Sequence, residues 1–341
     1  MPDTLEYLIF GEHSNFNQLV DNLPNSLLHL DFGDNSLFNQ LVDKLPNNLT
    51  HLILGSKFNQ PIDNLPNSLK YLKFTNKFRD IFNQSVNNLP KKLTYLFLGD
   101  SFNDLVDNLP TQLTNLTFEK NFNQPVDNLP NSIKHLIFGY YFNQSVDNLP
   151  NQLINLTFRC NFNQKINNLP NSIKYLTFSE SSNFNLPIDN LPTQLTNLTF
   201  GKNFNQPVDN LPTQLTNLTF RYYFNQPVDN LPHQLIKLTF GESFNQPVDN
   251  LPTQLTILTF GYNFNQQIDL LPNSITHLIF SERCCFNKPI NLLPNFIKYI
   301  KFGHKFNHQV NYLPSSIEEI RIENFYQKNL FPEELREKIK N

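Results

Sequence analysis

One short unit, seen clearly in residues 204–220, returns with little change along the whole sequence. It begins with Phe-Asn, passes through Leu-Pro and ends in Leu-x-x-Leu-x-Phe. The fifteen copies begin at Phe16, Phe38, Phe58, Phe82, Phe102, Phe122, Phe142, Phe162, Phe184, Phe204, Phe224, Phe244, Phe264, Phe286 and Phe306. A short fixed period of this kind is the signature of stacked repeats, so we predict a solenoid.

Six positions of each coil are apolar in nearly every copy, and we predict that they form the core. In the copy at residue 204 they are Phe204, Val208, Leu211, Leu215, Leu218 and Phe220. Leu218-Thr219-Phe220 alternates inward, outward and inward and favours one short strand per coil. The fold class is therefore an all-β-rich repeat solenoid of about sixteen parallel strands, with phenylalanine stacked on phenylalanine between coils.

The other half of the coil holds two prolines and an Asp-Asn pair, which exclude a regular helix. We predict an extended return arm with a tight corner and a single 3₁₀ turn before Leu215. The Asn of Phe-Asn is present in all fifteen copies. Its amide can satisfy backbone groups at the corner and pair with the asparagines of the neighbouring coils.

The solenoid is predicted to cover residues 1–322, and residues 323–341 are predicted to form a C-terminal cap. Phe331 to Lys340 begins with proline and acids and ends with lysine, which indicates a short helix. The sequence begins inside a repeat with no polar cap, so we expect an apolar edge there that could support self-association.

Composition excludes several classes of partner. The formal charge of −3 and the pI near 6.2 give no positive field for nucleic acid or for an anionic membrane. No apolar run is long enough to span a bilayer, and no secretory signal is recognisable. The three cysteines, Cys160, Cys284 and Cys285, are too few for a disulfide framework, so we expect an intracellular, cytoplasmic protein that is not secreted.

The pattern Phe-Asn-Gln-Pro-Val-Asp-Asn-Leu-Pro resembles the FNIP repeat, a relative of the leucine-rich repeat that is abundant in amoebae and in giant viruses that infect them. The resemblance covers Met1 to Ile322 and implies a leucine-rich-repeat-like stack in an amoeba or its virus. Many FNIP proteins carry an N-terminal F-box, which recruits a ubiquitin ligase. We expect none here, because the sequence begins within a repeat.

The surface that can carry function is the set of outward positions on the strands. One cluster combines aromatic and basic side chains on adjacent strands beside a longer loop at residues 75–81, a composition typical of protein-binding hot spots. Its members are Tyr71, Lys73, Tyr95 and Phe97, with Phe78 and Arg79 in the loop. The alternative is that these residues are ordinary strand formers on an exposed sheet.

A second candidate for partner binding lies at the loop edge. It consists of Tyr140 and Tyr141 together with Arg221, Tyr222 and Tyr223. Single exposed tyrosines are common on protein surfaces and need no functional explanation, so this hypothesis ranks below the first.

No metal, cofactor or catalytic site is predicted. His29 and His51 are expected to be neighbours with Asp31 close by, but only two or three ligands converge there. Cys284 and Cys285 lie next to Arg283, which could make them redox-sensitive, although simple free thiols are favoured. Catalytic motifs are missing from the sequence, and a periodic array presents like groups in rows, whereas an active site needs unlike groups at one point.

The sequence therefore favours a non-enzymatic scaffold that binds a protein partner through the strand face or the loop edge. The alternative is a substrate-recognition component of a ubiquitin-ligase pathway whose adaptor is supplied in trans. A third hypothesis is binding to a repetitive surface, such as a polysaccharide or ice, through a threonine ladder. The ladder comprises Thr157, Thr177, Thr199, Thr219, Thr239 and Thr259.

Overall fold

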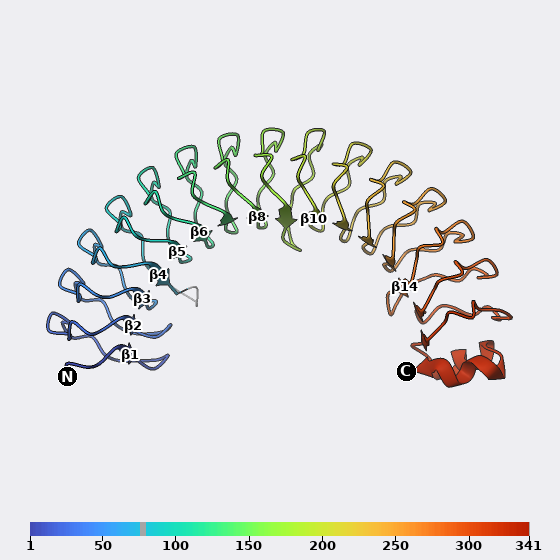
Figure 1. The fold of residues 1–341 in the computed structure, drawn as a ribbon, viewed down its shortest axis with the longest axis horizontal. Coiled ribbons are helices and arrows are strands. Elements are labelled where there is room, and N and C mark those ends of the chain that lie inside the picture. The colour runs from blue at the N-terminus through green and yellow to red at the C-terminus, as the bar shows by residue number, and fades with distance from the viewer. Residues whose placement is uncertain (76–79, 341) are drawn as a thin grey trace. The chain divides into compact units, whose positions relative to one another are not determined.

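The computed structural model describes residues 1–75 and 80–340. The chain forms two compact units, Met1–Ile173 and Lys174–Asn341, and each is described by itself. Both are stacks of coils in which each coil contributes one short strand and returns through an extended arm (Figure 1). The predicted repeat solenoid is confirmed.

The N-terminal unit holds eight strands within the described residues. They are β1 (Tyr7–Ile9), β2 (His29–Asp31), β3 (His51–Leu54), β4 (Tyr71–Phe74), β5 (Tyr95–Leu98), β6 (Asn115–Phe118), β7 (His135–Ile137) and β8 (Asn155–Phe158). Each strand pairs in parallel with the next, and equivalent repeat positions lie opposite one another, as with Tyr71 and Tyr95. The register of strand pairing therefore follows the sequence repeat, because each strand residue pairs with the residue at the same position of the next repeat.

The C-terminal unit continues the same pattern. Its strands are β9 (Tyr175–Phe178), β10 (Asn197–Thr199), β11 (Asn217–Thr219), β12 (Lys237–Thr239), β13 (Ile257–Phe260), β14 (His277–Phe280), β15 (Tyr299–Lys301), β16 (Glu319–Arg321) and β17 (Ile339–Lys340). Two 3₁₀ helices, η1 (Phe325–Leu330) and η2 (Glu333–Lys338), lie between β16 and β17, at the red end of the ribbon (Figure 1).

The C-terminal cap differs in detail from the prediction. The helix expected from Phe331 to Lys340 is the shorter η2, because its last two residues leave the helix and pair with β16, with Ile339 opposite Ile320. The helix η1 was not predicted. Its Gln327 side chain is buried and donates hydrogen bonds to the backbone oxygens of Gly303 and Phe306, which ties the cap to the preceding coil.

The strand of the representative coil begins one residue earlier than predicted, at Asn217. Leu218 is fully buried, while Asn217 and Thr219 are half-buried, so the predicted alternation is correct. Phe220 lies beyond the assigned strand, yet its backbone N–H still donates to the Thr239 oxygen at 2.8 Å. Only the boundary therefore differs.

The return arm contains the predicted single turn. The backbone N–H of Leu215 donates to the carbonyl oxygen of Pro212 at 3.1 Å, and the same bond joins Leu235 to Pro232. The turn does not continue into a helix, because the chain enters the next strand two residues later. The Leu-Pro-x-x-Leu sequence thus forms the turn that precedes each strand and sets its direction.

Phenylalanine rings fill the core in the predicted manner. The ring of Phe204 packs against that of Phe200, with centroids 3.7 Å apart, and stacks on that of Phe224 in the next coil at 6.2 Å. The interplanar angles are 8° and 6°, so the rings are nearly parallel. Because Phe204 is fully buried, its whole side chain contributes to the contact between coils.

Replacing Phe204 with Ala is expected to lower the free energy of unfolding by about 3–5 kcal/mol, because the cavity is lined by rigid stacked rings. Chemical denaturation followed by circular dichroism measures this loss. Thr219→Ala, on the outward side of the strand, is the matched control and is expected to change stability by less than about 0.5 kcal/mol. Equal losses in the two variants would contradict the stacked core.

The Asn of Phe-Asn forms a ladder of a specific kind. The backbone N–H of Asn245 donates to Oδ1 of Asn225 in the preceding coil at 2.8 Å. The side chain of Gln246 donates to the backbone oxygen of Asn225 at 3.2 Å. The ladder therefore consists of hydrogen bonds between side chain and backbone, in which the Asn side-chain oxygen of one coil accepts from the backbone N–H of the equivalent Asn in the next coil.

Removing one step of this ladder is expected to destabilise the stack measurably. Asn225→Ala leaves the backbone N–H of Asn245 without its acceptor, which costs about 1–3 kcal/mol for a group shielded from water. Asn225→Asp keeps an oxygen at the same place and is expected to lose less. Thermal unfolding of the two variants tests this, and an equal loss in both would argue against the hydrogen bond as the cause.

Candidate functional site

The strand face of the N-terminal unit carries a continuous row of stacked rings, which we call the aromatic stripe. Its members are Tyr7, His29, His51, Tyr71 and Tyr95, at the same position of strands β1 to β5. Successive ring centroids are 5.8, 5.6, 5.4 and 4.4 Å apart. The parallel register aligns these positions, so each ring packs against the ring of the next strand.

A second column runs beside the stripe and includes Ile53, Lys73 and Phe97. The Lys73 ammonium lies 5.8 Å from the centroid of the Phe97 ring, within the range of a cation–π contact. The structure thus brings together Tyr71, Lys73, Tyr95 and Phe97 as predicted. The predicted loop members Phe78 and Arg79 lie outside the described residues.

The four clustered side chains are half-buried rather than fully exposed, which corrects the sequence-based expectation. Each ring covers the face of its neighbour, so the stripe offers ring edges and polar atoms to a partner. Tyr7 and Ile9 on β1 are more open, with 61% and 64% of their surface exposed. The stripe is therefore an amphipathic strip, half-buried at Tyr71 and Tyr95 and most exposed at β1.

The protonation of the stripe follows from its packing. Burial, followed by the neighbouring Tyr95, raises the pKa of Tyr71 to about 12, so its phenol stays a hydrogen-bond donor. Burial, followed by His29 and Lys70, lowers the pKa of His51, so this imidazole is neutral at pH 7. Both groups therefore present polar atoms without net charge.

The hypothetical metal ligands His29, His51 and Asp31 have other roles. The two imidazole rings stack on each other at 5.6 Å. Oδ1 of Asp31 accepts a hydrogen bond from the backbone N–H of Gly33 at 2.8 Å. Gly33 has a φ of +82°, so this carboxylate braces a turn that a side chain would strain.

The loop-edge candidates fall into two patches, one in each unit. In the N-terminal unit, Tyr140 and Tyr141 pack edge to face at 4.9 Å and are 42% and 44% exposed. In the C-terminal unit, Tyr222 and Tyr223 pack similarly, and Arg221 forms an ion pair with Glu180 at 3.6 Å.

An apolar row on the return arms of the C-terminal unit was missed. At the Asn position of Asp-Asn-Leu-Pro, three consecutive coils carry Leu270, Leu292 and Tyr312, which are 65%, 64% and 64% exposed. In several earlier coils the Asn at this position donates to the Asp of the preceding coil, as Asn250 does to Asp229 at 3.1 Å. The sequence does contain a signal for this row, because Asn is replaced at the same repeat position in three successive coils.

The vicinal cysteines do not form a reactive pair of thiolates. Cys284 is fully buried, and burial raises the pKa of its thiol to about 12. Its Sγ donates weakly to the Phe264 oxygen at 3.6 Å. Cys285 is only partly buried, and both thiols are free. Cys284 is therefore a core residue.

We expect folded protein at pH 8 to show slow labelling by a thiol-specific reagent at Cys285 and none at Cys284. A thiol with a pKa near 12 is almost wholly protonated at this pH, and Cys284 is not accessible. Mass spectrometry of the labelled peptides makes the measurement. Cys285→Ser should abolish the slow labelling, and Cys284→Ser should leave it unchanged. Fast modification of Cys284 would contradict its buried position.

The geometry defines a class of protein: a leucine-rich-repeat-like solenoid built from short parallel strands. The family model described as FNIP Repeat matches residues 38–77, 105–141, 122–161, 142–181, 183–223, 204–243, 244–283 and 286–325. The chain therefore belongs to the FNIP-repeat family, as the sequence resemblance predicted.

The solved structures that are similar to this chain include the following two. CroV588, a giant-virus protein described as a novel circular LRR protein, is 38% identical with a TM-score of 0.73. The match covers 97% of this chain and 61% of CroV588, so the chain spans less than two thirds of that relative. The functional domain of InlJ from Listeria monocytogenes is 16% identical with a TM-score of 0.63, and the match covers 96% of this chain and 71% of that domain. The second match supports the fold alone.

No protein among the curated sequences matches significantly. Within residues 1–75 and 80–340, no helix has the length and apolar character needed to cross a bilayer.

Repeat solenoids of this kind are typically non-enzymatic scaffolds for protein interaction.

Proposed function

We propose that the protein is a non-enzymatic scaffold that binds a protein partner inside the cell through the aromatic stripe and its flanking residues. The observation that carries the proposal is the unbroken row of five rings on strands β1 to β5. Tyrosine is enriched at energetically important positions of protein interfaces because it combines a large apolar body with a polar tip.

The rest of the same face supports the choice of this region. Strands β6 and β8 present Asn115 with Thr117 and Asn155 with Thr157, which are small and polar. These side chains offer little apolar area to a partner. The unbroken row of rings ends at β5, because Asn115 on β6 follows Tyr95, and the next ring, His135 on β7, lies two strands away from Tyr95.

The chemistry of the stripe favours a protein over a polyanion. His51 and Tyr71 are uncharged at neutral pH, and Lys73 is held over the Phe97 ring. Binding to nucleic acid usually needs a dense basic surface, whereas an amphipathic strip suits a peptide segment or a flat protein face.

Replacing Tyr71, Tyr95 and Phe97 together with Ala is expected to abolish capture of the principal partner from an amoebal lysate, because these side chains supply the central apolar contact. Affinity capture followed by mass spectrometry compares this variant with the wild type. The matched control is Asn115→Ala with Thr117→Ala, on the adjacent strand. Circular dichroism must show that both variants remain folded.

The outcomes separate the alternative sites and functions. Equal capture by the triple variant would reject the stripe, and variants of Tyr140 with Tyr141, or of Tyr222 with Tyr223, would then test the loop edge. Ligase subunits among partners lost with the stripe would favour the substrate-recognition alternative. Size-exclusion chromatography of the wild type alone tests self-association through the exposed Tyr7 and Ile9 on β1.

A further inference from the structure

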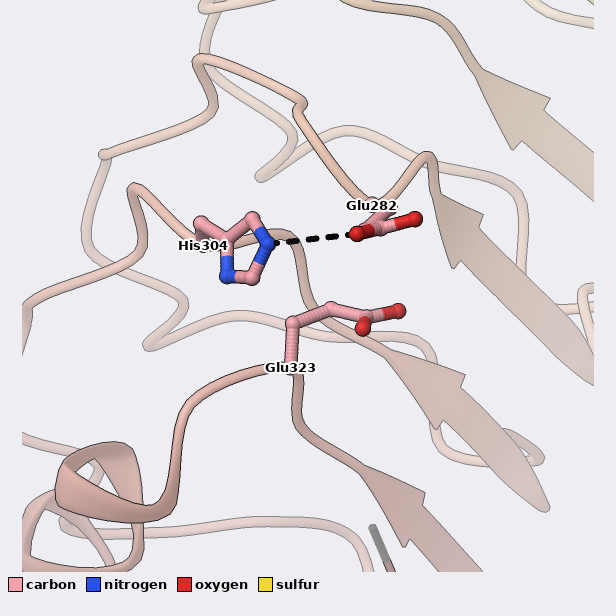
Figure 2. A group of neighbouring side chains, drawn as sticks. All are labelled: Glu282, His304 and Glu323. Carbon is pink, nitrogen blue, oxygen red and sulfur yellow. Dashed lines mark ion pairs between the residues drawn. The ribbon is translucent and has the colours of Figure 1, made fainter.

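Three side chains from successive coils of the C-terminal unit converge outside the surfaces described above. Glu282 follows β14, His304 follows β15, and Glu323 follows β16 (Figure 2). One ligand atom from each, a carboxylate oxygen or an imidazole nitrogen, lies within 4.8 Å of the others. In the described part of the chain, this is the one such group of at least three potential ligands.

The backbone holds this group in place. The N–H of His304 donates to the carbonyl oxygen of Glu282 at 2.8 Å, continuing the coil-to-coil pairing beyond the strands. Glu323 lies two residues after β16, which pairs in register with β15. The pairing between coils therefore holds the three Cα atoms in place. Rotation of the side chains alone would bring the three ligand atoms closer together.

The spacing of the first two ligands suits a metal ion. Nε2 of His304 and Oε1 of Glu282 are 3.4 Å apart, which is long for a hydrogen bond between them. Two ligands of a tetrahedral zinc ion with bonds of about 2.1 Å are separated by about 3.4 Å. Figure 2 shows the Glu323 side chain, from the following coil, beside the Glu282 and His304 side chains.

Charge and access also suit a divalent cation. The two carboxylates supply two negative charges, the imidazole supplies a nitrogen ligand, and the Glu282 and His304 side chains are 63% and 43% exposed. Lys301 is the competitor, because its ammonium lies 2.6 Å from Oε1 of Glu323. A metal ion must therefore share or displace one ion pair.

We propose that Glu282, His304 and Glu323 bind a divalent transition-metal ion of the Zn²⁺ type, with water completing the coordination. Mixed imidazole and carboxylate ligands suit Zn²⁺, whereas Mg²⁺ and Ca²⁺ prefer sets made only of oxygen. The ion joins three successive coils next to the C-terminal cap. Since it binds the folded state, it stabilises this end of the unit.

The test is calorimetric titration of the full chain, freed of metal by a chelator, with Zn²⁺, and with Mg²⁺ as the comparison ion. Wild type is expected to bind one Zn²⁺ at this site and to melt at a higher temperature with Zn²⁺ than without. His304→Ala is expected to lose both effects, and Glu282→Gln to weaken binding. His308→Ala, which removes a half-buried histidine of the same coil, is the matched control and should bind as the wild type does.

Lys301→Met provides a variant with the opposite expected effect. It removes the ammonium that competes for Glu323, so Zn²⁺ is expected to bind more tightly than to the wild type. An ion bound elsewhere, for instance by another of the eight histidines, would not respond in this way. Absence of Zn²⁺ binding by the wild type, or binding unaltered by His304→Ala, overturns the proposal. Unaltered affinity in Lys301→Met removes Glu323 from the ligand set and overturns the site as proposed.

Discussion

Every coil of this protein depends on its neighbours, because no coil has enough depth to bury its own apolar side chains. The rings of the Phe-Asn column contact the rings of the coils before and after them, as Phe224 contacts Phe204 and Phe244. The strand hydrogen bonds and the asparagine ladder run in the same direction. Apolar burial, strand pairing and the asparagine ladder therefore all act between coils, and a single coil is not stable without its neighbours.

The sequence sufficed to predict the fold because these three kinds of contact repeat with one period. The inward positions of Leu218 and Phe220, the turn before Leu215 and the ladder of asparagines all followed from a single coil. The C-terminal cap departs from the period, and there the prediction was less accurate. The helix η1 has no equivalent among the described residues of the other coils, and it depends on buried hydrogen bonds from Gln327 to a coil more than twenty residues earlier.

The candidate surfaces were predictable only where a side chain differs from the repeat at a position that faces outward. Tyr71 and Tyr95 met that condition, and the structure extends their pair into a row that begins at Tyr7. Their partial burial was not predictable from composition, because it arises from ring-to-ring stacking between strands. The apolar row at Leu270, Leu292 and Tyr312 lies on the return arms, so the alternation of inward and outward strand positions does not reveal it.

The asparagine ladder also bears on how such a protein can change in length. The Asn side-chain oxygen of each coil accepts a hydrogen bond from the following coil, and the backbone N–H of the same Asn donates to the preceding coil. The two sides of a coil are therefore complementary to each other, so any coil can stack on any other. Duplicating or deleting a whole coil restores every contact at the junction, whereas inserting half a coil leaves both rings and amides mismatched. Gain or loss of length by recombination between repeats is therefore tolerated in steps of one coil. The same event moves outward side chains apart or together by one strand spacing, about 4.8 Å.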